Sequence, residues 1–458
     1  MIALAWPMVV IQLLQVAYNI ADTIWLGRLS ADAVGALSLA FPLIFFLISI
    51  GGGFTTAGSI LVAQYTGAQS EESAGKVAGQ TLSFVTIVAT SLGIVGFFVT
   101  DPMLALLPAD AETAAQVVPL AARYMRVFFL GIPFLFGFFV FSSLMRGYGN
   151  TRTPMRVMAV SVAINVVLDP VLIFGWGPVP ALGIEGAAVA TVFARGVATV
   201  LGFYVLFRTS VGPDVAVSDL LPDLSLIWEI VRVGVPSAAE QSTSALAMIT
   251  LTAMVASFAP PVVAAYGLGN RLISLVFLPA MGLGRATNTM VGQNLGADKP
   301  DRAERAVHLA VVFSVGVLLV IAVVAALFPD PIVGVFLGDV PDAAVTIAYG
   351  SEYVRIRSVE FVFIGVLQVL LGAFRGAGNT KTAMGISMVT LWLGRVPTVY
   401  YLAFVAGWGP LGIWVGMALG NIVGAIVAAA WFSRGTWKQA IVEAPPTGVQ
   451  PAEGHVED

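Results

Sequence analysis

The fold is decided by the stretch from Leu4 to Leu26, LAWPMVVIQLLQVAYNIADTIWL, which is apolar and long enough to cross a bilayer as one helix. Four polar side chains recur in it at helical spacing and form one stripe on the helix surface. They are Gln12, Gln15, Asn19 and Asp22. A carboxylate at membrane depth costs at least ~2.5 kcal/mol, so it normally faces a protein interior or a watery cavity. Asp22 therefore lies either in a buried polar site or in the headgroup region at the helix end.

The rest of the chain has the composition of a polytopic membrane protein. Of its 458 residues, 58% are hydrophobic and only 10% are charged, and the mean hydropathy is +0.92. Apolar runs of helix length recur without the alternation of outer-membrane strands, which predicts an α-helical bundle. The absence of cysteine excludes disulfides and thiolate metal sites. The only histidines are His308 and His455, which leaves no basis for histidine catalysis or a metal cluster.

We expect an all-α membrane protein with about twelve transmembrane helices. Their predicted ranges are residues 4–26, 34–61, 77–99, 120–145, 154–174, 183–207, 227–258, 262–290, 306–328, 353–374, 383–404 and 411–432. The polar, proline-containing stretch 208–225 predicts a cytoplasmic linker between an N-terminal six-helix lobe, 1–207, and a C-terminal six-helix lobe, 226–438. Residues 439–458 are poor in apolar residues and predict a disordered cytoplasmic tail.

An internal repeat relates the two halves. RGYGNTRT at residues 146–153 recurs as RGAGNTKT at residues 375–382, an offset of 229 residues. The same offset carries Pro7 to Pro236, Gln64 and Gly67 to Gln293 and Gly296, Asp101 to Asp330, Tyr124 to Tyr353, and Gly183 to Gly412. An even number of crossings per half keeps both halves parallel, so the repeat predicts two pseudo-symmetric bundles with a site between them.

Small residues on the last helix predict close helix packing. Gly412, Gly416, Gly420 and Gly424 form a ladder at every fourth position.

The distribution of lysine and arginine orients the chain. With twelve crossings, most cations share the side of both termini, which is the cytoplasm by the positive-inside rule. They are Arg146, Arg152, Arg156, Lys299, Arg302, Arg305, Arg375, Lys381, Arg434 and Lys438. We therefore expect a multi-pass protein of the plasma or inner membrane. Five arginines fall on the opposite side and are expected to cap helix ends at the outer face: Arg28, Arg123, Arg126, Arg355 and Arg357.

Few ionisable residues fall inside the predicted spans. They are Asp22, Asp169, Glu185, Arg195, Glu240, Arg271, Arg285, Glu360 and Arg395. Asp169 follows Asn165 by one helical turn, so both project from one helix face, and Pro170 loosens the backbone there. Glu240 lies four residues after Pro236 and is expected to be a second-lobe site or an interhelical strut. Structural roles are the simpler interpretation for Glu185, Arg195 and Arg285.

Several motifs resemble those of the multidrug and toxic compound extrusion (MATE) transporters, in particular the prokaryotic branch related to DNA-damage-inducible protein F. The resemblance covers nearly the whole chain. It rests on YNIADT at residues 18–23, NVVLDP at 165–170, GVP at 234–236 followed by Glu240, GQNLGA at 292–297, and both Gly-x-Gly-Asn-Thr loops. The family usually begins with a short basic arm, whereas this chain begins inside the helix, so Met1 is expected to be a misassigned or truncated start.

The resemblance implies a secondary active antiporter, not an enzyme, that exports cationic or amphipathic organic compounds in exchange for H⁺ or Na⁺ by alternating access. It implies no cofactor besides the coupling ion, no nucleic-acid partner, a lipid environment, and, we expect, a monomer. The matching branch places the coupling site in the first lobe, which here implies Asp22, Asn165 and Asp169; these would ligate the metal ion if Na⁺ is used. Pro7 matches the proline at which the family's first helix bends. Candidates for the substrate cavity or its surroundings are Gln15, Asn19, Thr191, Glu240 and Gln241.

The repeat also predicts that coupling is confined to the first lobe. The offset carries Asp22 to Leu251, Asn165 to Gly394 and Asp169 to Thr398, so the scaffold was kept in both halves but the acids were not. Two carboxylates that share a buried site can hold a proton, or with an amide oxygen they can ligate Na⁺.

Two alternatives stay open. A lipid-linked oligosaccharide flippase of the same superfamily would share the bundle, but its pyrophosphate substrate calls for a more cationic central cavity. A membrane receptor or enzyme is the alternative of a different class, and it is disfavoured because the sequence offers neither a catalytic set nor a soluble domain.

Overall fold

The structure, a computed structural model, describes residues 2–105, 111–335 and 343–442, and these residues form helices and short connections without a strand. The first bundle contains six helices. They are α1 (Ile2–Leu29), α2 (Ala31–Gly67), α3 (Glu71–Ala105), α4 (Ala111–Tyr148), α5 (Arg152–Phe174) and α6 (Ile184–Arg208).

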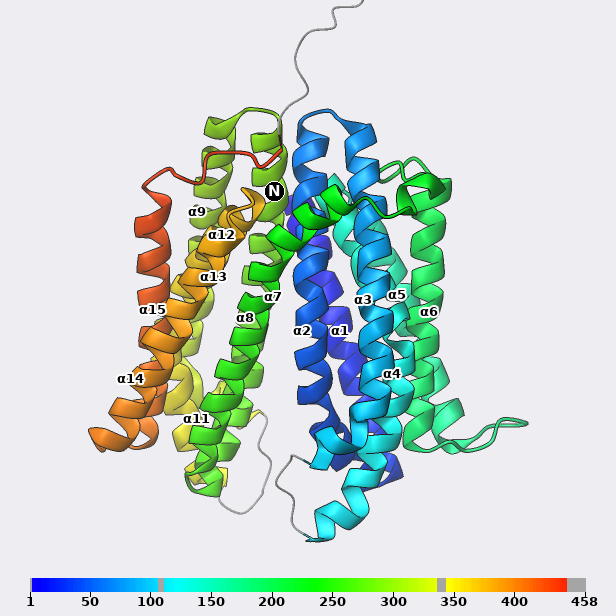
Figure 1. The fold of residues 1–458 in the computed structure, drawn as a ribbon. Helices are drawn as coiled ribbons and strands as arrows, with labels where there is room; N and C mark the ends of the chain where they lie inside the picture. The colour runs from blue at the N-terminus through cyan, green and yellow to red at the C-terminus, as the bar shows by residue number, and fades with distance from the viewer. Residues whose placement is uncertain (1, 106–110, 336–342, 443–458) are drawn as a thin grey trace, which may run out of the picture.

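The second bundle repeats this order with more breaks. It consists of α7 (Leu224–Ala256), α8 (Pro260–Gly296), α9 (Pro300–Leu327), the short α10 (Pro329–Gly334), α11 (Ala343–Ser358), α12 (Phe361–Gly376), α13 (Thr380–Met388), η2 (Val389–Arg395), α14 (Val396–Tyr400), η3 (Tyr401–Val405) and α15 (Pro410–Phe432). Figure 1 shows the two bundles side by side, with the chain crossing from one to the other between α6 and α7.

The predicted number of membrane crossings agrees with this architecture. Within the described residues, nine helices are long and apolar enough to span a membrane, and the bent pair α11 and α12 makes a tenth. The long helices α2 and α7 complete six crossings in each bundle. The chain is therefore an all-α membrane protein with two six-helix lobes, as the repeat predicts.

Two predicted spans differ from the structure. The sequence predicts one membrane helix over residues 353–374, but in the structure this span begins at Ala343 and bends by 50° between α11 and α12. Residues 383–404 are helical throughout, but two stretches of this span, η2 and η3, are wound as π-helix. Such wider turns commonly mark functional or strained places in a helix.

The glycine ladder of α15 brings that helix into backbone contact with its neighbour. A Cβ atom on Gly416 would lie 2.8 Å from Val399, and one on Gly420 would meet Arg395. Gly412 and Gly424 approach Leu402 and Thr390 in the same way. Since lipid removes the hydrophobic drive for helix association, such close van der Waals contact is what holds these helices together.

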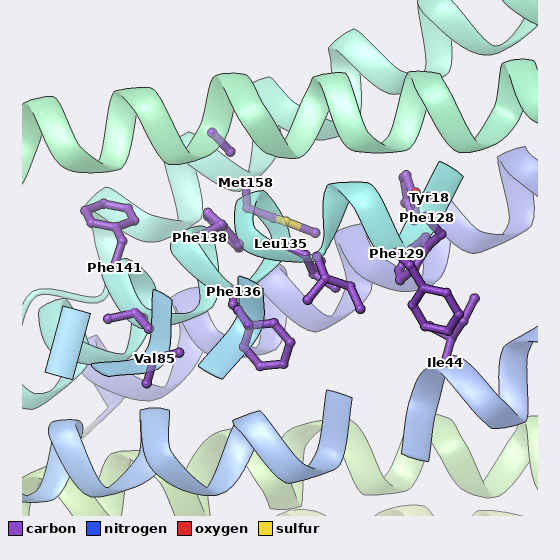
Figure 2. Packing of buried hydrophobic residues seen from close by; sticks show 14 of the residues in the cluster. Tyr18, Ile44, Val85, Phe128, Phe129, Leu135, Phe136, Phe138, Phe141 and Met158 are labelled. Atoms are coloured by element: carbon purple, nitrogen blue, oxygen red, sulfur yellow. The ribbon is translucent and has the colours of Figure 1, made fainter. Parts of the chain in front are cut away.

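The interior of the N-terminal lobe is rich in aromatic side chains from α4. Phe129, Phe136 and Phe141 are almost completely buried, and Figure 2 shows them packed among aliphatic residues of neighbouring helices. Met158 of α5 lies in the same cluster, where its flexible thioether fills space between the rings. This rigid core fixes the relative positions of α1, α4, α5 and α6.

One end of the molecule, here named the terminal face, carries residue 2, the last described residues 433–442 and the turns at residues 68–70, 149–151, 297–299 and 377–379 (top in Figure 1). The segment between the lobes also lies on this face. It is more than a polar tether, because the Gln80 side chain donates to the carbonyls of Asp219 and Leu221 at 2.7 and 2.6 Å and accepts from the Asp223 amide at 2.8 Å.

The chain end also departs from the expected disordered tail. Trp437 is fully buried against Phe432, with ring centroids 4.7 Å apart, and Lys438 pairs with Glu304 at 2.7 Å. Residues 439–442 continue across the terminal face, and the amide of Ile441 donates to the Gln64 side chain at 2.8 Å. The predicted tail therefore begins later than residue 439, and its remainder, 443–458, lies outside the described residues.

The two lobes meet near the terminal face through a pair of symmetry-related contacts. Gln64 of α2 donates to the carbonyl of Gly376, and Gln293 of α8 donates to the carbonyl of Gly147, both at 3.0 Å. The repeat offset carries the first contact onto the second. These two hydrogen bonds, here named the glutamine latch, tie each lobe to the other.

Close helix crossings surround the glutamine latch. A Cβ atom on Gly67 would overlap the carbonyl of Gln293, and one on Gly296 would overlap that of Gln64. Farther along, Ser49 of α2 and Ser242 of α7 share a hydrogen bond at 3.2 Å. The contacts around the glutamine latch lie near the terminal face, whereas Ser49 and Ser242 lie about midway along α2 and α7. Figure 1 shows the ribbons of the two lobes diverging toward the other end.

Candidate functional site

The residues that the sequence singled out in the first lobe lie together in its interior. Asp22 of α1 is 5% exposed, and Asn165 and Asp169 of α5 are completely buried. Asp22 is therefore not a headgroup residue at the helix end, because its carboxylate faces the inside of the lobe.

The two carboxyl groups of Asp22 and Asp169, here named the acid pair, are buried close enough to interact electrostatically. Ionised carboxylates are acceptors only, so a hydrogen bond between them requires a proton. The Asn165 amide donates to Asp169 Oδ1 at 3.1 Å, as the one-turn spacing predicts. The α5 motif thus presents one carboxylate and one amide oxygen toward α1.

Three buried oxygens in this cluster have no hydrogen-bond donor among the residues that the structure describes. They are Asp22 Oδ1, Asn165 Oδ1 and Asp169 Oδ2. Buried polar atoms are nearly always satisfied, and an unpaired buried carboxylate is especially costly. Oxygen-only acceptors without donors are suited to a proton or a hard cation such as Na⁺.

Arg195 of α6 is the cation nearest to the acid pair. Its guanidinium donates to Gln15 Oε1 at 2.7 Å and lies over the Tyr18 ring at 5.3 Å, within electrostatic range of Asp22. Two carboxylates and one guanidinium leave one negative charge in the cluster. A single monovalent cation would therefore make it neutral.

Tyr18 and Tyr124 complete the surroundings of the acid pair. The Tyr18 hydroxyl shares a hydrogen bond of 2.5 Å with Thr191 and lies within reach of Asp22. Tyr124 of α4 is buried near both carboxylates. Thr191, a candidate for the substrate cavity or its surroundings, bridges α6 to α1 through Tyr18.

Sequence reasoning missed Tyr18, Tyr124 and the position of Arg195. Tyr18 precedes Asp22 by one turn, so helical spacing could have indicated it. Arg195 follows Thr191 by one turn, but a membrane arginine alone does not reveal its partner. Tyr124 comes from a helix distant in sequence, and nothing in its neighbourhood indicates the contact.

The other cavity candidates occupy different places. Gln15 bridges Arg195 and Asn19, whose own side chain is exposed. Gln241 lies at the junction of the lobes, where its amide approaches Gly52 of α2. α1 runs as one continuous helix through Pro7 in this structure.

Glu240 of α7 acts as an interhelical strut. Its carboxylate pairs with Arg375 of α12 at 2.6 Å and accepts from Ser387 of α13 at 2.7 Å, so it ties three helices of the second lobe. Of the two roles predicted for Glu240, the structure supports the strut. Arg375 had been counted as a cytoplasmic loop cation, but it lies in the last helical turn with its side chain turned inward.

The second lobe contains its own buried charged cluster, here named the C-lobe ion cluster: Arg357, Glu360, Arg395 and Asn421. Arg357 and Glu360 form a buried ion pair, and Asn421 of α15 donates to the second oxygen of Glu360 at 2.9 Å. Arg357 was expected to cap a helix end at the outer face, and that prediction is wrong because the side chain is only 5% exposed. Arg126, by contrast, forms an exposed ion pair with Asp101 near the end of α3.

Comparison with known proteins identifies relatives over the whole length. The family model described as MatE matches residues 7–171 and 236–401, two segments that differ by the repeat offset of 229 at their starts. A probable multidrug resistance protein, YoeA of Bacillus subtilis (strain 168), is 30% identical over 441 residues and covers 94% of this chain and 92% of its own. A protein of Shewanella oneidensis named FAD transporter is 28% identical over 391 residues, 85% of this chain and 84% of its own.

Solved structures agree with these relatives. One, described as the outward-facing conformation of a multidrug resistance MATE family transporter of the MOP superfamily, superposes with a TM-score of 0.87 at 26% identity over 95% of this chain and 96% of that chain. A crystal structure of MATE in the bent conformation gives a TM-score of 0.86 at 25% identity, with 94% of each chain covered.

Proposed function

Since the chain belongs to the MatE family of multidrug and toxic compound extrusion transporters, which are membrane transporters and not enzymes, we propose that it is an antiporter driven by an H⁺ or Na⁺ gradient. Its cargo is organic, either amphipathic or cationic, and moves out of the cytoplasm by alternating access. The acid pair holds the coupling ion.

The charge balance around the acid pair carries this proposal. The cluster has one uncompensated negative charge and three acceptor oxygens without donors among the described residues. One proton between the carboxylates would neutralise the charge and satisfy one oxygen of each aspartate, and one Na⁺ bound by Asp22, Asp169 and Asn165 would neutralise the charge and satisfy all three oxygens. Glu240, which acts as a helix strut, differs in that both of its carboxylate oxygens accept hydrogen bonds.

The first helix links the ion site to the junction of the lobes. α1 carries Asp22 in its far half, while Gln12 in its near half accepts from Arg285 of α8 at 3.3 Å. Gly282 of α8 packs against Val9 of the same helix. An ion that changes the packing of α1 around Asp22 therefore acts directly on a contact between the lobes.

This arrangement supports negative linkage between ion and cargo. Ion binding favours one lobe arrangement, in which the cargo is released outward, and the ion-free acid pair favours the arrangement that binds cargo. By linkage, the cargo must then weaken ion binding by the same factor.

The proposal includes the orientation of the chain, with the terminal face in the cytoplasm. Arg146 and Arg375 turn inward and do not contribute to this assignment, but Arg152, Arg302 and Lys381 remain on that face. In the cysteine-free chain, Lys299→Cys should react with a membrane-impermeant maleimide from the cytoplasmic side and Trp176→Cys from the outside. Reaction of both from one side would contradict the orientation.

Reconstituted protein tests the coupling. Proteoliposomes carrying ethidium should show gradient-driven transport under either a pH gradient or a Na⁺ gradient imposed alone, and Asp22→Asn should remove it. Leu251→Asn, at the repeat-related position in α7, is the matched control and should leave the gradient dependence unchanged. Transport that ignores both gradients would contradict the proposal and favour the flippase alternative.

A further inference from the structure

Three arginines and one glutamate meet where the two lobes join, and they are here named the arginine junction: Arg146, Arg285, Arg375 and Glu240. They come from α4, α8, α12 and α7, so both lobes contribute. The Thr289 hydroxyl donates to the carbonyl oxygens of Arg146 and Arg285 at 3.1 and 3.4 Å, and Arg285 also lies within electrostatic range of Arg375. Arginine stays protonated in proteins, so three guanidinium groups face one carboxylate and leave an excess of two positive charges.

Only one of these arginines has an acidic partner. Arg375 pairs with Glu240, whereas Arg146 donates to the hydroxyls of Ser142 and Ser143 at 2.8 and 3.0 Å. Arg285 donates to the neutral amide of Gln12. Among the residues that the structure describes, no carboxylate forms an ion pair with Arg146 or Arg285. Neutral partners satisfy individual N–H groups but leave both charges uncompensated.

Positive charge of this kind is costly at membrane depth. Buried or intramembrane ions are normally paired, and an unpaired one is strongly destabilising. The junction is also accessible in part: 23% of the Arg375 side chain is exposed, and Arg146 and Arg285 are partly exposed. The glutamine latch lies directly beside it, because Gly147 and Gly376 follow Arg146 and Arg375 in sequence and close the terminal side.

We infer that the arginine junction is a binding subsite for the acidic group, carboxylate or phosphate, of an amphipathic organic cargo. This inference rests on the proposed export function and names the chemical class of what is exported. Positive charge between the lobes is also what the flippase alternative calls for, and gradient-driven transport in proteoliposomes distinguishes the two. The planar forks of Arg146 and Arg285 suit bidentate recognition of such oxyanions. The two sites then bind opposite charges: the acid pair holds the coupling cation, and the arginine junction holds the anionic end of the cargo.

Three dansyl compounds with one fluorophore and different charges test this assignment on purified protein in detergent. They are dansylglycine, which is anionic, dansylamide, which is neutral, and dansylcadaverine, which is cationic. Dansylglycine should bind about tenfold more tightly than dansylamide, measured by fluorescence enhancement. Equal affinity of the two compounds, or preference for dansylcadaverine, would overturn the inference.

Single-residue variants show which side chains cause the preference for dansylglycine over dansylamide. Arg285→Gln should reduce it to about twofold while leaving dansylamide binding unchanged, and Arg146→Gln should act in the same direction if the first variant folds poorly. The matched control Arg302→Gln removes the same charge from the exposed start of α9 and should keep the tenfold preference. A preference that survives both Arg285→Gln and Arg146→Gln places the anion elsewhere and overturns the assignment.

The paired arginine provides a sharper control. Replacing Arg375 and Glu240 together by glutamine removes one charge of each sign, so the excess of two positive charges remains. The double variant should therefore keep most of the preference for dansylglycine. A loss as large as that in Arg285→Gln would show that the subsite does not act through its net charge.

A competition experiment distinguishes the cargo from a free anion. Inorganic phosphate at low millimolar concentration should not displace dansylglycine, because the apolar part of the cargo contributes to binding. Displacement would make the junction a site for inorganic anions and overturn the inference. Since none of these measurements uses a gradient, failure of ion coupling in proteoliposomes would contradict the proposed function without altering this result.

Discussion

The two lobes share one scaffold but hold opposite buried charge clusters. In the N-terminal lobe two carboxylates face one guanidinium, and three acceptor oxygens have no donor among the described residues. In the C-lobe ion cluster one carboxylate faces two guanidinium groups, and both of its oxygens are bonded, one to Arg357 and one to Asn421. The first cluster is short of a cation, whereas the carboxylate of the second is already satisfied.

This difference arose on positions that the repeat makes equivalent. Tyr124 and Tyr353 are copies of each other and both are buried, but the offset carries Phe128 to Arg357 and Gly131 to Glu360. The N-terminal helix α4 is continuous through these positions, whereas the second lobe bends there between α11 and α12. Duplication thus preserved the packing while the ionisable residues diverged.

The largest effect is expected from neutralising the acid pair. Asp22→Asn and Asp169→Asn should each lower gradient-driven efflux at least a hundredfold, because the amide can neither hold the proton nor supply the charge for Na⁺. The melting temperature should stay the same or rise, since each change removes an unpaired buried carboxylate. Transport assays and thermal unfolding of the same preparations measure both.

Normal efflux by Asp22→Asn under a saturating gradient would contradict this prediction. The acid pair would then have no role in coupling, and its difference from the C-lobe ion cluster would have no functional meaning.

In the C-lobe ion cluster we expect a substitution to lower stability and to leave ion coupling intact, the reverse of the effect at the acid pair. Arg357→Met removes the hydrogen-bonded partner of Glu360 and leaves its carboxylate with Asn421 and the more distant charge of Arg395. Breaking a buried ion pair in this way typically costs about 3–5 kcal/mol of stability. The melting temperature should therefore fall markedly, while molecules that remain folded keep their dependence on the ion gradient.

The double variant Arg357→Met and Glu360→Gln tests whether charge is the cause. It removes both members of the pair and leaves only the partly exposed Arg395 charged, so it should recover part of the lost stability. A loss of gradient dependence in the stable double variant would mean that the second lobe also takes part in coupling.

The glutamine latch joins the lobes through two contacts that the repeat makes equivalent. Substituting either glutamine should have a smaller effect than the changes above, and the effects of the two substitutions should differ. Gln64 donates to Gly376 and accepts from the amides of Ile441 and Val442, whereas Gln293 makes only the latch bond among these contacts. At about 0.5 kcal/mol for each hydrogen bond, Gln64→Ala should favour opening of the terminal face about tenfold and Gln293→Ala about twofold.

Labelling can measure that opening. Thr289 is buried between the lobes. In the otherwise cysteine-free chain, the rate at which a maleimide reacts with a cysteine at this position (Thr289→Cys) therefore reports how often the terminal face opens. Removing residues 439–458 should raise the rate in the same direction as Gln64→Ala. Equal rates for both glutamine variants would show that the chain end contributes nothing to closure.

Much of the fold could be predicted because repetition is visible in sequence. The offset of 229 residues, the glycine ladder and the apolar runs all depend on local spacing, which a helix preserves in three dimensions. Asp22, Asn165 and Asp169 could be singled out for a similar reason, since polar groups in apolar helices are rare. Their mutual proximity, however, depends on how α1 and α5 pack.

The features that sequence did not predict are those set by distant contacts. The bend at Glu360 has no glycine or proline beside it, and it coincides with the buried pair that this residue forms with Arg357. Arg375 reads as a loop cation until Glu240 is seen beside it. The docking of the interlobe segment on Gln80 likewise joins residues far apart in the chain, for which spacing gives no signal.

The smallest effect is expected at Thr398, the position that the repeat makes equivalent to Asp169. Its side chain is only partly buried, and no hydrogen bond of its hydroxyl is found among the described residues. It lies in α14 between two π-helical stretches, so an alanine there removes one hydroxyl and one methyl group without disturbing a charged contact. Thr398→Ala should therefore change gradient-driven efflux by less than about twofold and leave the melting temperature within about 2 °C, consistent with the usual cost of a substitution away from buried charges. Thr398 and Asp169 occupy equivalent positions in the two lobes. Comparing Thr398→Ala with Asp169→Asn therefore shows whether coupling depends on the carboxylate or on the position in the fold. If Thr398→Ala lowered efflux more than about threefold at unchanged stability, the shape of this helix, rather than the acid pair alone, would determine coupling, and the two lobes would have to be treated as partners in it.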